Sequence, residues 1–306
     1  MEQANDLHPI QVLTSFRFER GPQVIPAPFD YLAPTSVEEA LSALAGSDDA
    51  KVIAGGQSLL PVLRMRLNAP ELLVDIGKID TLQDIVDEGD SILIGSMVPY
   101  YKILADPSVQ TGLGLLHQAI TEVADPQIRH RGTLGGSLVH ADPAGDCGAP
   151  ILALDAELVV AGQDGERTVA AADFFEDLFT TVVGEDELLT HIRVPKHDGW
   201  GSHYEKFVRI AHQWPIVAVA AAVKTDGSTI SEARIGLVNM GSTPLRAAAT
   251  EQALVGKEAT ADGVREACDQ AADGTNPPSD LNGDADYRKH LAKVLTRRAV
   301  LAAAGG

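Results

Sequence analysis

Two glycine pairs, each beside hydroxyl residues, are the part of this sequence best suited to chemistry. They lie in the stretches Ala54-Gly55-Gly56-Gln57-Ser58 and Thr133-Leu134-Gly135-Gly136-Ser137. Glycine adopts positive φ angles and lets a ligand approach the main chain without a Cβ in the way. Consecutive backbone N–H groups can then converge on one anion, and nearby hydroxyls add donors. A single pair is more typical of a tight turn, whereas two similar pairs predict a pyrophosphate site held from both sides.

Other phosphate, metal and nucleophile signatures are missing from the sequence. There is no G-x-x-x-x-G-K-[ST] motif of P-loop hydrolases and no G-x-G-x-x-G of Rossmann dinucleotide sites. The two cysteines, Cys147 and Cys268, are too few for an iron–sulfur cluster or a thiolate zinc site. His140, Asp142 and Asp146 form an incomplete set of metal ligands. We therefore predict no metal site in this chain and assign no catalytic residue to it.

The composition is that of an acidic globular protein of more than one domain. The chain has 306 residues, a formal net charge of -19 and 45% hydrophobic residues. Such a charge disfavours binding to nucleic acid and to anionic lipid. The first residues lack the basic start and apolar core of a secretory signal, and the apolar run 215–223 is too short to span a bilayer. We expect a cytoplasmic protein.

The elements that must position the glycine pairs alternate between helix and strand as far as residue 199. Ser36 and Glu39 have the spacing of a capping box before a helical pattern that Gly46 can end. Strand signals follow at 51–56, 71–76, 91–96 and 157–162, with helical patterns at 114–125 and 149–156; Pro126 helps to end the first of these helices, and 126–146 is expected to be a loop. Beyond residue 199, three successive strand patterns predict an antiparallel sheet, and helical patterns complete the chain.

Three stretches resemble one known family. They read "AGGQSLLPVLRMRL", "DPQIRHRGTLGGSLVHADPAGD" and "YEKFVRIAHQWPIVAVAAAV". Together they resemble the FAD-binding medium subunit of the molybdenum hydroxylase family, which includes aerobic carbon monoxide dehydrogenase and xanthine dehydrogenase. The resemblance covers about residues 27–303. It implies an α+β fold in which a two-lobed α/β FAD-binding domain of the PCMH/vanillyl-alcohol-oxidase type precedes a domain of three-stranded antiparallel sheet plus helices.

The resemblance also implies a domain division, a cofactor and partners. We expect an N-terminal extension at 1–26, an FAD-binding domain at 27–199 with its lobe boundary near 80, and a C-terminal domain at 200–306. The family carries non-covalent FAD in this subunit. A small subunit holds two [2Fe–2S] clusters, a large subunit holds the molybdopterin cofactor, and the assembly is a dimer of heterotrimers. FAD passes electrons to an external acceptor, through which the complex can associate peripherally with a membrane.

The family's FAD contacts carry over to this sequence residue by residue. The two glycine stretches would hold the pyrophosphate through backbone N–H groups, one from each lobe. Asp146 would hydrogen-bond the flavin side, Lys206 would place a cation near the ring, Trp214 would cover one ring face, and Leu189 would make an apolar contact. Gln57, Ser137 and Trp214 replace a histidine, an asparagine and a tyrosine of the carbon monoxide enzymes, which weakens the case for carbon monoxide as the substrate.

Several alternatives stay open at this stage. Lys206 could be a surface residue and Trp214 a core residue, while Arg129 and Arg131 could pair with phosphates or face water. Cys147 is expected to be a small buried side chain. As a whole, the chain could instead be a self-sufficient FAD oxidoreductase that binds its own small organic substrate, or a scaffold that has lost its flavin. The retained glycines argue against the scaffold.

Overall fold

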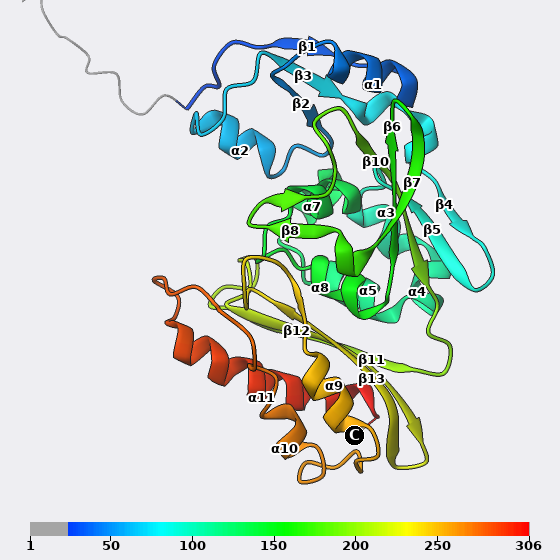
Figure 1. The fold of residues 1–306 in the computed structure, drawn as a ribbon, viewed down its shortest axis with the longest axis vertical. Helices are drawn as coiled ribbons and strands as arrows, with labels where there is room; N and C mark the ends of the chain where they lie inside the picture. The colour runs from blue at the N-terminus through cyan, green and yellow to red at the C-terminus, as the bar shows by residue number, and fades with distance from the viewer. Residues whose placement is uncertain (1–23, 306) are drawn as a thin grey trace, which may run out of the picture.

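The computed structural model describes residues 24–305 and arranges them in three sheets and their covering helices, together with a small hairpin (Figure 1). Nearly all of the predicted extension, residues 1–23, lies outside the described residues. The predicted α+β class is confirmed. The elements fall into a first lobe, a second lobe and a C-terminal part, which follow one another along the chain.

The first lobe is a three-stranded parallel sheet with strand order β1-β3-β2. Its elements are β1 (Asp30–Leu32), α1 (Val37–Ala45), β2 (Ala50–Ile53), α2 (Leu59–Arg64) and β3 (Leu72–Asp75). The predicted cap of α1 is confirmed, because the Ser36 hydroxyl accepts a hydrogen bond from the Glu39 N–H at 3.2 Å. The Glu39 carboxylate accepts a hydrogen bond from the Thr35 N–H at 2.9 Å, and not from the Ser36 N–H. Strand β2 ends at Ile53, one residue before the first glycine pair.

The second lobe is a five-stranded antiparallel sheet with strand order β4-β5-β10-β6-β7. Its strands are β4 (Ile85–Asp87), β5 (Ser91–Gly95), β6 (Glu157–Gly162), β7 (Gly165–Ala170) and β10 (Leu188–Pro195), and a small hairpin joins β8 (Phe175–Asp177) to β9 (Thr180–Thr181). The helices are α3 (Tyr100–Ala105), α4 (Pro107–Gly112), α5 (Gly114–Thr121), α6 (Pro126–Arg131), α7 (Leu134–His140) and α8 (Gly148–Ala153). Three short 3₁₀ turns, η1 (Ile76–Lys78), η2 (Asp80–Leu82) and η3 (Ala171–Asp173), join these elements.

The predicted loop 126–146 was wrong, since it contains two short helices. Helix α5 already ends at Thr121, and Pro126 begins α6 instead of ending α5. Asp125 caps α6 by accepting from the Ile128 N–H at 3.0 Å, and Pro126 at the first helical position has no N–H to satisfy. Thr133 caps α7, whose first turn contains the second glycine pair. Glycine lowers helix propensity, which hid α7 in the sequence.

The C-terminal part is a four-stranded antiparallel sheet with three helices. Its strands are β11 (Gly201–Phe207), β12 (Val217–Asp226), β13 (Thr229–Val238) and β14 (Leu245–Arg246), in that order, and its helices are α9 (Ala248–Leu254), α10 (Arg265–Cys268) and α11 (Ala285–Ala303). The first three strands match the prediction, while β14 occupies the start of the helical pattern at 244–256, of which α9 forms the rest. The predicted division near 199 lies in the connection between β10 and β11.

Strand β12 is buried on both faces, which explains its continuous apolar run. Ala218, Ala220 and Ala222 point into the core of the second lobe. Val217, Val219 and Val223 point the other way, into the core beneath α11. The small alanine side chains allow the C-terminal sheet to approach the second lobe closely, so the two parts share one apolar boundary.

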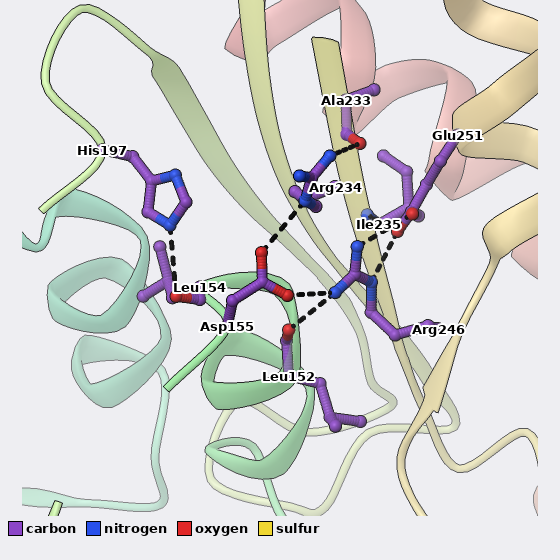
Figure 2. Close-up of polar contacts among 9 residues, drawn as sticks. All are labelled: Leu152, Leu154, Asp155, His197, Ala233, Arg234, Ile235, Arg246 and Glu251. Atoms are coloured by element: carbon purple, nitrogen blue, oxygen red, sulfur yellow. Dashed lines mark hydrogen bonds and ion pairs between the residues drawn. The ribbon is translucent and has the colours of Figure 1, made fainter. Parts of the chain in front are cut away.

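Polar contacts at the edge of this boundary centre on Arg246 (Figure 2). Its guanidinium donates to Asp155 Oδ1 at 2.7 Å and to the Leu152 carbonyl at 3.0 Å, both at the end of α8. The other side of the same group donates to both Glu251 carboxylate oxygens, at 2.6 and 2.8 Å. Arg234 adds a second bond to Asp155 at 3.1 Å. Arg246 therefore joins the second lobe to the C-terminal part.

Candidate functional site

The two glycine stretches, about 80 residues apart in sequence, pack against each other. A Cβ on Gly55 would overlap the carbonyl oxygen of Arg131 and would lie 2.9 Å from the Cα of Gly132. A Cβ on Gly136 would lie 3.3 Å from the Cβ of Ala54. Only glycine permits such close approach of one backbone to another. The first lobe and the second lobe therefore meet at the two glycine pairs.

The first stretch has the features of a backbone anion site. Gly56 has φ 73°, a conformation that other residues adopt only at a cost. The backbone N–H groups of Gly55, Gly56, Gln57 and Ser58 find no acceptor within residues 24–305. The Gln57 side chain turns back to donate to the Gly55 carbonyl at 3.0 Å, and the Ser58 hydroxyl makes no capping bond to α2. A row of unengaged donors at a left-handed glycine fits an anionic group such as a pyrophosphate.

The second stretch differs, because protein oxygens already accept from its backbone N–H groups. Leu134 donates to the Val98 carbonyl at 3.3 Å, Gly135 to the Ser96 carbonyl at 3.1 Å, and Gly136 to the Thr133 hydroxyl at 3.1 Å. We expected backbone N–H groups of both lobes to hold the pyrophosphate. For this stretch that expectation is corrected, because its N–H groups already bond protein oxygens. It supports the first stretch by packing, and the polar groups it can still offer are the Thr133 and Ser137 hydroxyls.

Asp146 and Lys206 form a buried ion pair between the second lobe and β11. The Lys206 ammonium lies 2.9 Å from Asp146 Oδ2, and the side chains of the two residues are 2% and 6% exposed. Lys206 also donates to the Glu122 carbonyl at 2.8 Å, and the Tyr204 hydroxyl donates to Asp146 Oδ1 at 2.7 Å. The surface alternative for Lys206 is wrong. Flavin contacts of Asp146 and Lys206 stay predictions, and in the structure the two side chains are bonded to each other and to Tyr204 and the Glu122 carbonyl.

Burial is the largest influence on the pKa values of Asp146 and the neighbouring Cys147. It raises the pKa of Asp146 from 3.8 to about 6, against the opposing pull of Lys206 and Tyr204. Burial also raises the pKa of the neighbouring Cys147 thiol to about 12. Cys147 is fully buried, as expected, and its Sγ lies 3.7 Å from the Tyr100 hydroxyl. A thiol with so high a pKa is a structural side chain and not a nucleophile.

The two predicted ring contacts lie in opposite environments. Trp214 is 65% exposed in the connection between β11 and β12, so the alternative that it belongs to the core is wrong. Leu189 is 4% exposed on β10 and belongs to the core of the second lobe. An exposed indole is free to stack on a ligand, whereas Leu189 already packs within the protein. Both contacts to a flavin ring stay predictions.

Two further residues at this boundary had not been predicted. Tyr204 carries the hydroxyl that bonds Asp146, and Asn239 contacts the segments on both sides of the boundary. The signal for Asn239 was its place directly after a strand and before the turn-forming residues "MGS", where asparagine tolerates a left-handed conformation. Arg129, considered as a phosphate ligand, instead donates to the Val123 carbonyl at 2.6 Å, and Arg131 is exposed.

Two protein-family models match consecutive parts of the chain. The model described as "FAD binding domain in molybdopterin dehydrogenase" matches residues 27–197, more than half of the chain. The model described as "CO dehydrogenase flavoprotein C-terminal domain" matches residues 202–303.

The chain belongs to the FAD-binding medium subunits of the molybdenum hydroxylases. It is thus a flavoprotein subunit of an oxidoreductase, as the resemblance implied.

Curated relatives of this medium subunit agree over almost their whole length. The carbon monoxide dehydrogenase medium chain of Hydrogenophaga pseudoflava is 40% identical over 282 residues, which are 92% of this chain and 98% of that relative. The glyceraldehyde dehydrogenase medium chain of Sulfolobus acidocaldarius is 35% identical over 274 residues, 90% of this chain and 98% of that relative. The names of these relatives refer to different substrates, so the likeness does not single out one.

Solved structures show the same fold for the medium subunit. A structure of carbon monoxide dehydrogenase from Hydrogenophaga pseudoflava superposes with a TM-score of 0.89 at 42% identity, covering 91% of this chain and 98% of that chain. Quinoline 2-oxidoreductase from Pseudomonas putida 86 gives a TM-score of 0.89 at 33% identity, covering 92% of this chain and 98% of that chain.

Within residues 24–305 no helix has the length and apolar character to cross a membrane. In the same range, no cluster of three His, Cys, Asp or Glu side chains is arranged to hold a metal.

Proposed function

We propose that this medium subunit is the electron-transfer flavoprotein of a heteromeric molybdenum hydroxylase. The observation that carries the proposal is the row of unengaged backbone N–H groups at Gly55 to Ser58, held against the second lobe by glycine-to-backbone packing. Bound FAD supplies the chemistry, since it accepts electrons singly and releases them as a pair. The chain's own residues bind and orient it.

The proposal assigns a separate role to each group of residues. The first glycine stretch holds the pyrophosphate by its N–H groups, and the Thr133 and Ser137 hydroxyls face it from the second lobe. Lys206, fixed by Asp146, keeps a positive charge in the boundary between the two parts of the chain. Trp214 shields one face of the flavin ring from water. Leu189 makes an apolar contact with the ring from the core of the second lobe.

The names of the relatives indicate that this subunit has partner subunits. Many of these relatives are named as medium chains or medium subunits, which implies larger and smaller companions. We propose an iron–sulfur small subunit with two [2Fe–2S] clusters and a large subunit with the molybdopterin cofactor, assembled as a dimer of heterotrimers. Electrons reach the FAD from the clusters and leave to an external acceptor. The complex works in the cytoplasm, with at most a peripheral association with the membrane.

Anaerobic mixing tests the direction of electron flow. The FAD-loaded chain is mixed with the iron–sulfur subunit that has been reduced by dithionite and then freed of reductant. Flavin absorbance should bleach as the cluster absorbance returns, and a control with the oxidised iron–sulfur subunit should show no change. A flavin that stays oxidised beside the reduced clusters would contradict the proposal. If the FAD-loaded chain alone turned over a small organic donor, the self-sufficient oxidoreductase would be the better description.

A further inference from the structure

The connection that carries Trp214 is fixed at its base and exposed at its tip. It runs between β11 and β12, and the Ile216 N–H donates to the Phe207 carbonyl at 2.8 Å, which closes it. Pro215 and Ile216, the two residues after Trp214, are buried, whereas Trp214 itself is 65% exposed. The orientation of the indole therefore depends on what holds the backbone of Pro215 and Ile216.

Asn239 holds that backbone. It lies directly after β13, is 9% exposed and has φ 62°. Its Nδ2 donates to the Pro215 carbonyl at 2.9 Å and to the Ile216 carbonyl at 3.3 Å. The left-handed conformation is one that asparagine tolerates better than most residues, so the same residue type serves both the turn and the side-chain donor.

Asn239 also reaches across to the second lobe. Its backbone N–H donates to the Pro143 carbonyl at 2.8 Å, in the segment that joins α7 to α8. That segment follows the second glycine stretch and leads to Asp146. One residue is thus bonded through its side chain to the base of Trp214 and through its main chain to the segment beside the predicted flavin contacts.

A buried arginine on α11 also holds the backbone of Ile216. Arg288 on α11 has a side chain that is 1% exposed, and it donates to the Ile216 carbonyl and, at 2.8 Å, to Asp280 Oδ1. Arg288 fixes the segment relative to α11 only. Among these donors, Asn239 is the one that also bonds the second lobe, so it fixes the Pro215 backbone relative to the segment between α7 and α8.

We propose that Asn239 is a positioning residue that places Trp214 against the flavin. The inference rests on the proposed function, because it requires FAD between the two lobes and the C-terminal sheet. No contact between Asn239 and the flavin is required. Its side-chain amide fixes the Pro215 backbone, and its main chain fixes that amide relative to the second lobe.

The test uses the quenching of Trp214 fluorescence by added FAD. The whole chain carries Trp200→Phe, so that Trp214 is the sole tryptophan. Asn239→Gly keeps the left-handed backbone and its N–H while removing the amide donor, and Asn239→Asp keeps the shape while placing an acceptor against the Pro215 carbonyl. Both variants should bind FAD with nearly unchanged affinity, followed by flavin fluorescence, and lose most of the quenching of Trp214. Val264→Ala, a cavity in the core beneath α11, is the control for general destabilisation and should keep the quenching.

The outcomes separate this inference from the proposed function. A parent chain that binds no FAD would overturn the proposed function, and the inference with it. A parent chain that binds FAD without quenching of Trp214 would overturn the inference alone, since Trp214 would not lie against the ring. Equal quenching in the parent chain and both Asn239 variants would overturn it too. If Val264→Ala lost as much quenching as the Asn239 variants, the loss would reflect general destabilisation, and the positioning role of Asn239 would be overturned.

Discussion

Asp146 and Lys206 are joined by a 2.9 Å ion pair in which both side chains are almost completely buried. The pair connects the segment before α8 to strand β11, so it spans the boundary between the second lobe and the C-terminal part. Burial penalises both charges, and each is tolerated because the other is present. The ion pair thus adds a charged contact between the second lobe and the C-terminal part, which β12 and its neighbours join by apolar contacts.

Removing one member of this pair should destabilise the chain strongly. Lys206→Met leaves the Asp146 carboxylate buried without its cation, and losses of about 3–5 kcal/mol are typical of such half-removed pairs. The double variant Lys206→Met with Asp146→Asn should recover much of that loss, because no buried charge remains. Urea unfolding followed by circular dichroism measures both. A loss below about 1 kcal/mol for the single variant would show that water screens the pair.

The same carboxyl should give stability a distinct pH dependence. Because the pKa of Asp146 rises from 3.8 to about 6 on folding, the folded chain keeps a proton that the unfolded chain releases. The free energy of unfolding therefore falls as pH rises through this window, by about 3 kcal/mol for a difference of this size. The facing groups are Lys206, Tyr204, Tyr100, Cys147 and Glu122.

Comparison with Asp146→Asn isolates this contribution from the rest of the chain. Carboxylates with lowered pKa values, such as Asp87 and Glu187, act in the opposite direction and are common to both proteins. The difference in unfolding free energy, wild type minus variant, should fall between about pH 4 and about pH 7. A difference that stays constant, or that rises, would mean that Lys206 keeps the carboxyl ionised throughout.

Gly135 should matter for the stability of the fold rather than for ligand binding. A Cβ there would collide with the side chain and backbone of Ser96, so the helix α7 would have to move away from β5. Gly135→Ala should cost about 1–3 kcal/mol, as overpacking in a dense core does. Thermal unfolding of the FAD-free chain measures this loss. An unchanged melting temperature would mean that the contact between α7 and the Ser96 segment is loose.

Replacing Arg246 should lower the free energy of unfolding more than replacing its ion-pair partner Asp155. Arg246→Met leaves the Glu251 carboxylate, whose side chain is 11% exposed, without its bidentate donor, and should cost about 1–3 kcal/mol. Asp155 has a side chain that is 50% exposed, so Asp155→Ala should cost less than about 1 kcal/mol. Chemical unfolding of the two variants checks the order. The reverse order would place the critical contact at the end of α8 instead of at α9.

Local signals in the sequence predicted much of the scaffold. Ser36 caps its helix as expected, and the strand expected at 51–56 forms but stops at Ile53. The helical pattern at 286–304 forms the last helix, Ala285–Ala303. These features depend on residues close in sequence, where capping and periodicity act. The short helices α6 and α7 escaped notice, because six or seven residues carry too little periodic signal, and α7 also contains two glycines.

Contacts between distant segments could not be predicted in this way. The sequence marked Asp146 and Lys206 as separate site residues, and only the fold shows that they pair. It marked both glycine stretches as donors, whereas the structure shows that the backbone N–H groups of the second are used in holding α7 against Ser96 and Val98. Asn239 had no distinguishing signal beyond its turn. Each of these facts depends on how the lobes and the C-terminal sheet pack.

An FAD titration of Gly56→Ala tests most directly whether the backbone of the first glycine stretch holds FAD. Gly56 has φ 73°, and the matched control Gly89→Ala changes a glycine with φ 99° in the exposed turn between β4 and β5. Each variant should lose about 1 kcal/mol of stability from the left-handed backbone, and Gly56→Ala should lose somewhat more, because its Cβ would lie 3.1 Å from the Leu60 side chain. Gly56→Ala should bind FAD at least about tenfold more weakly than wild type, equivalent to about 1.4 kcal/mol, while Gly89→Ala binds it normally. Equal FAD affinity of the two variants would contradict this role of the backbone.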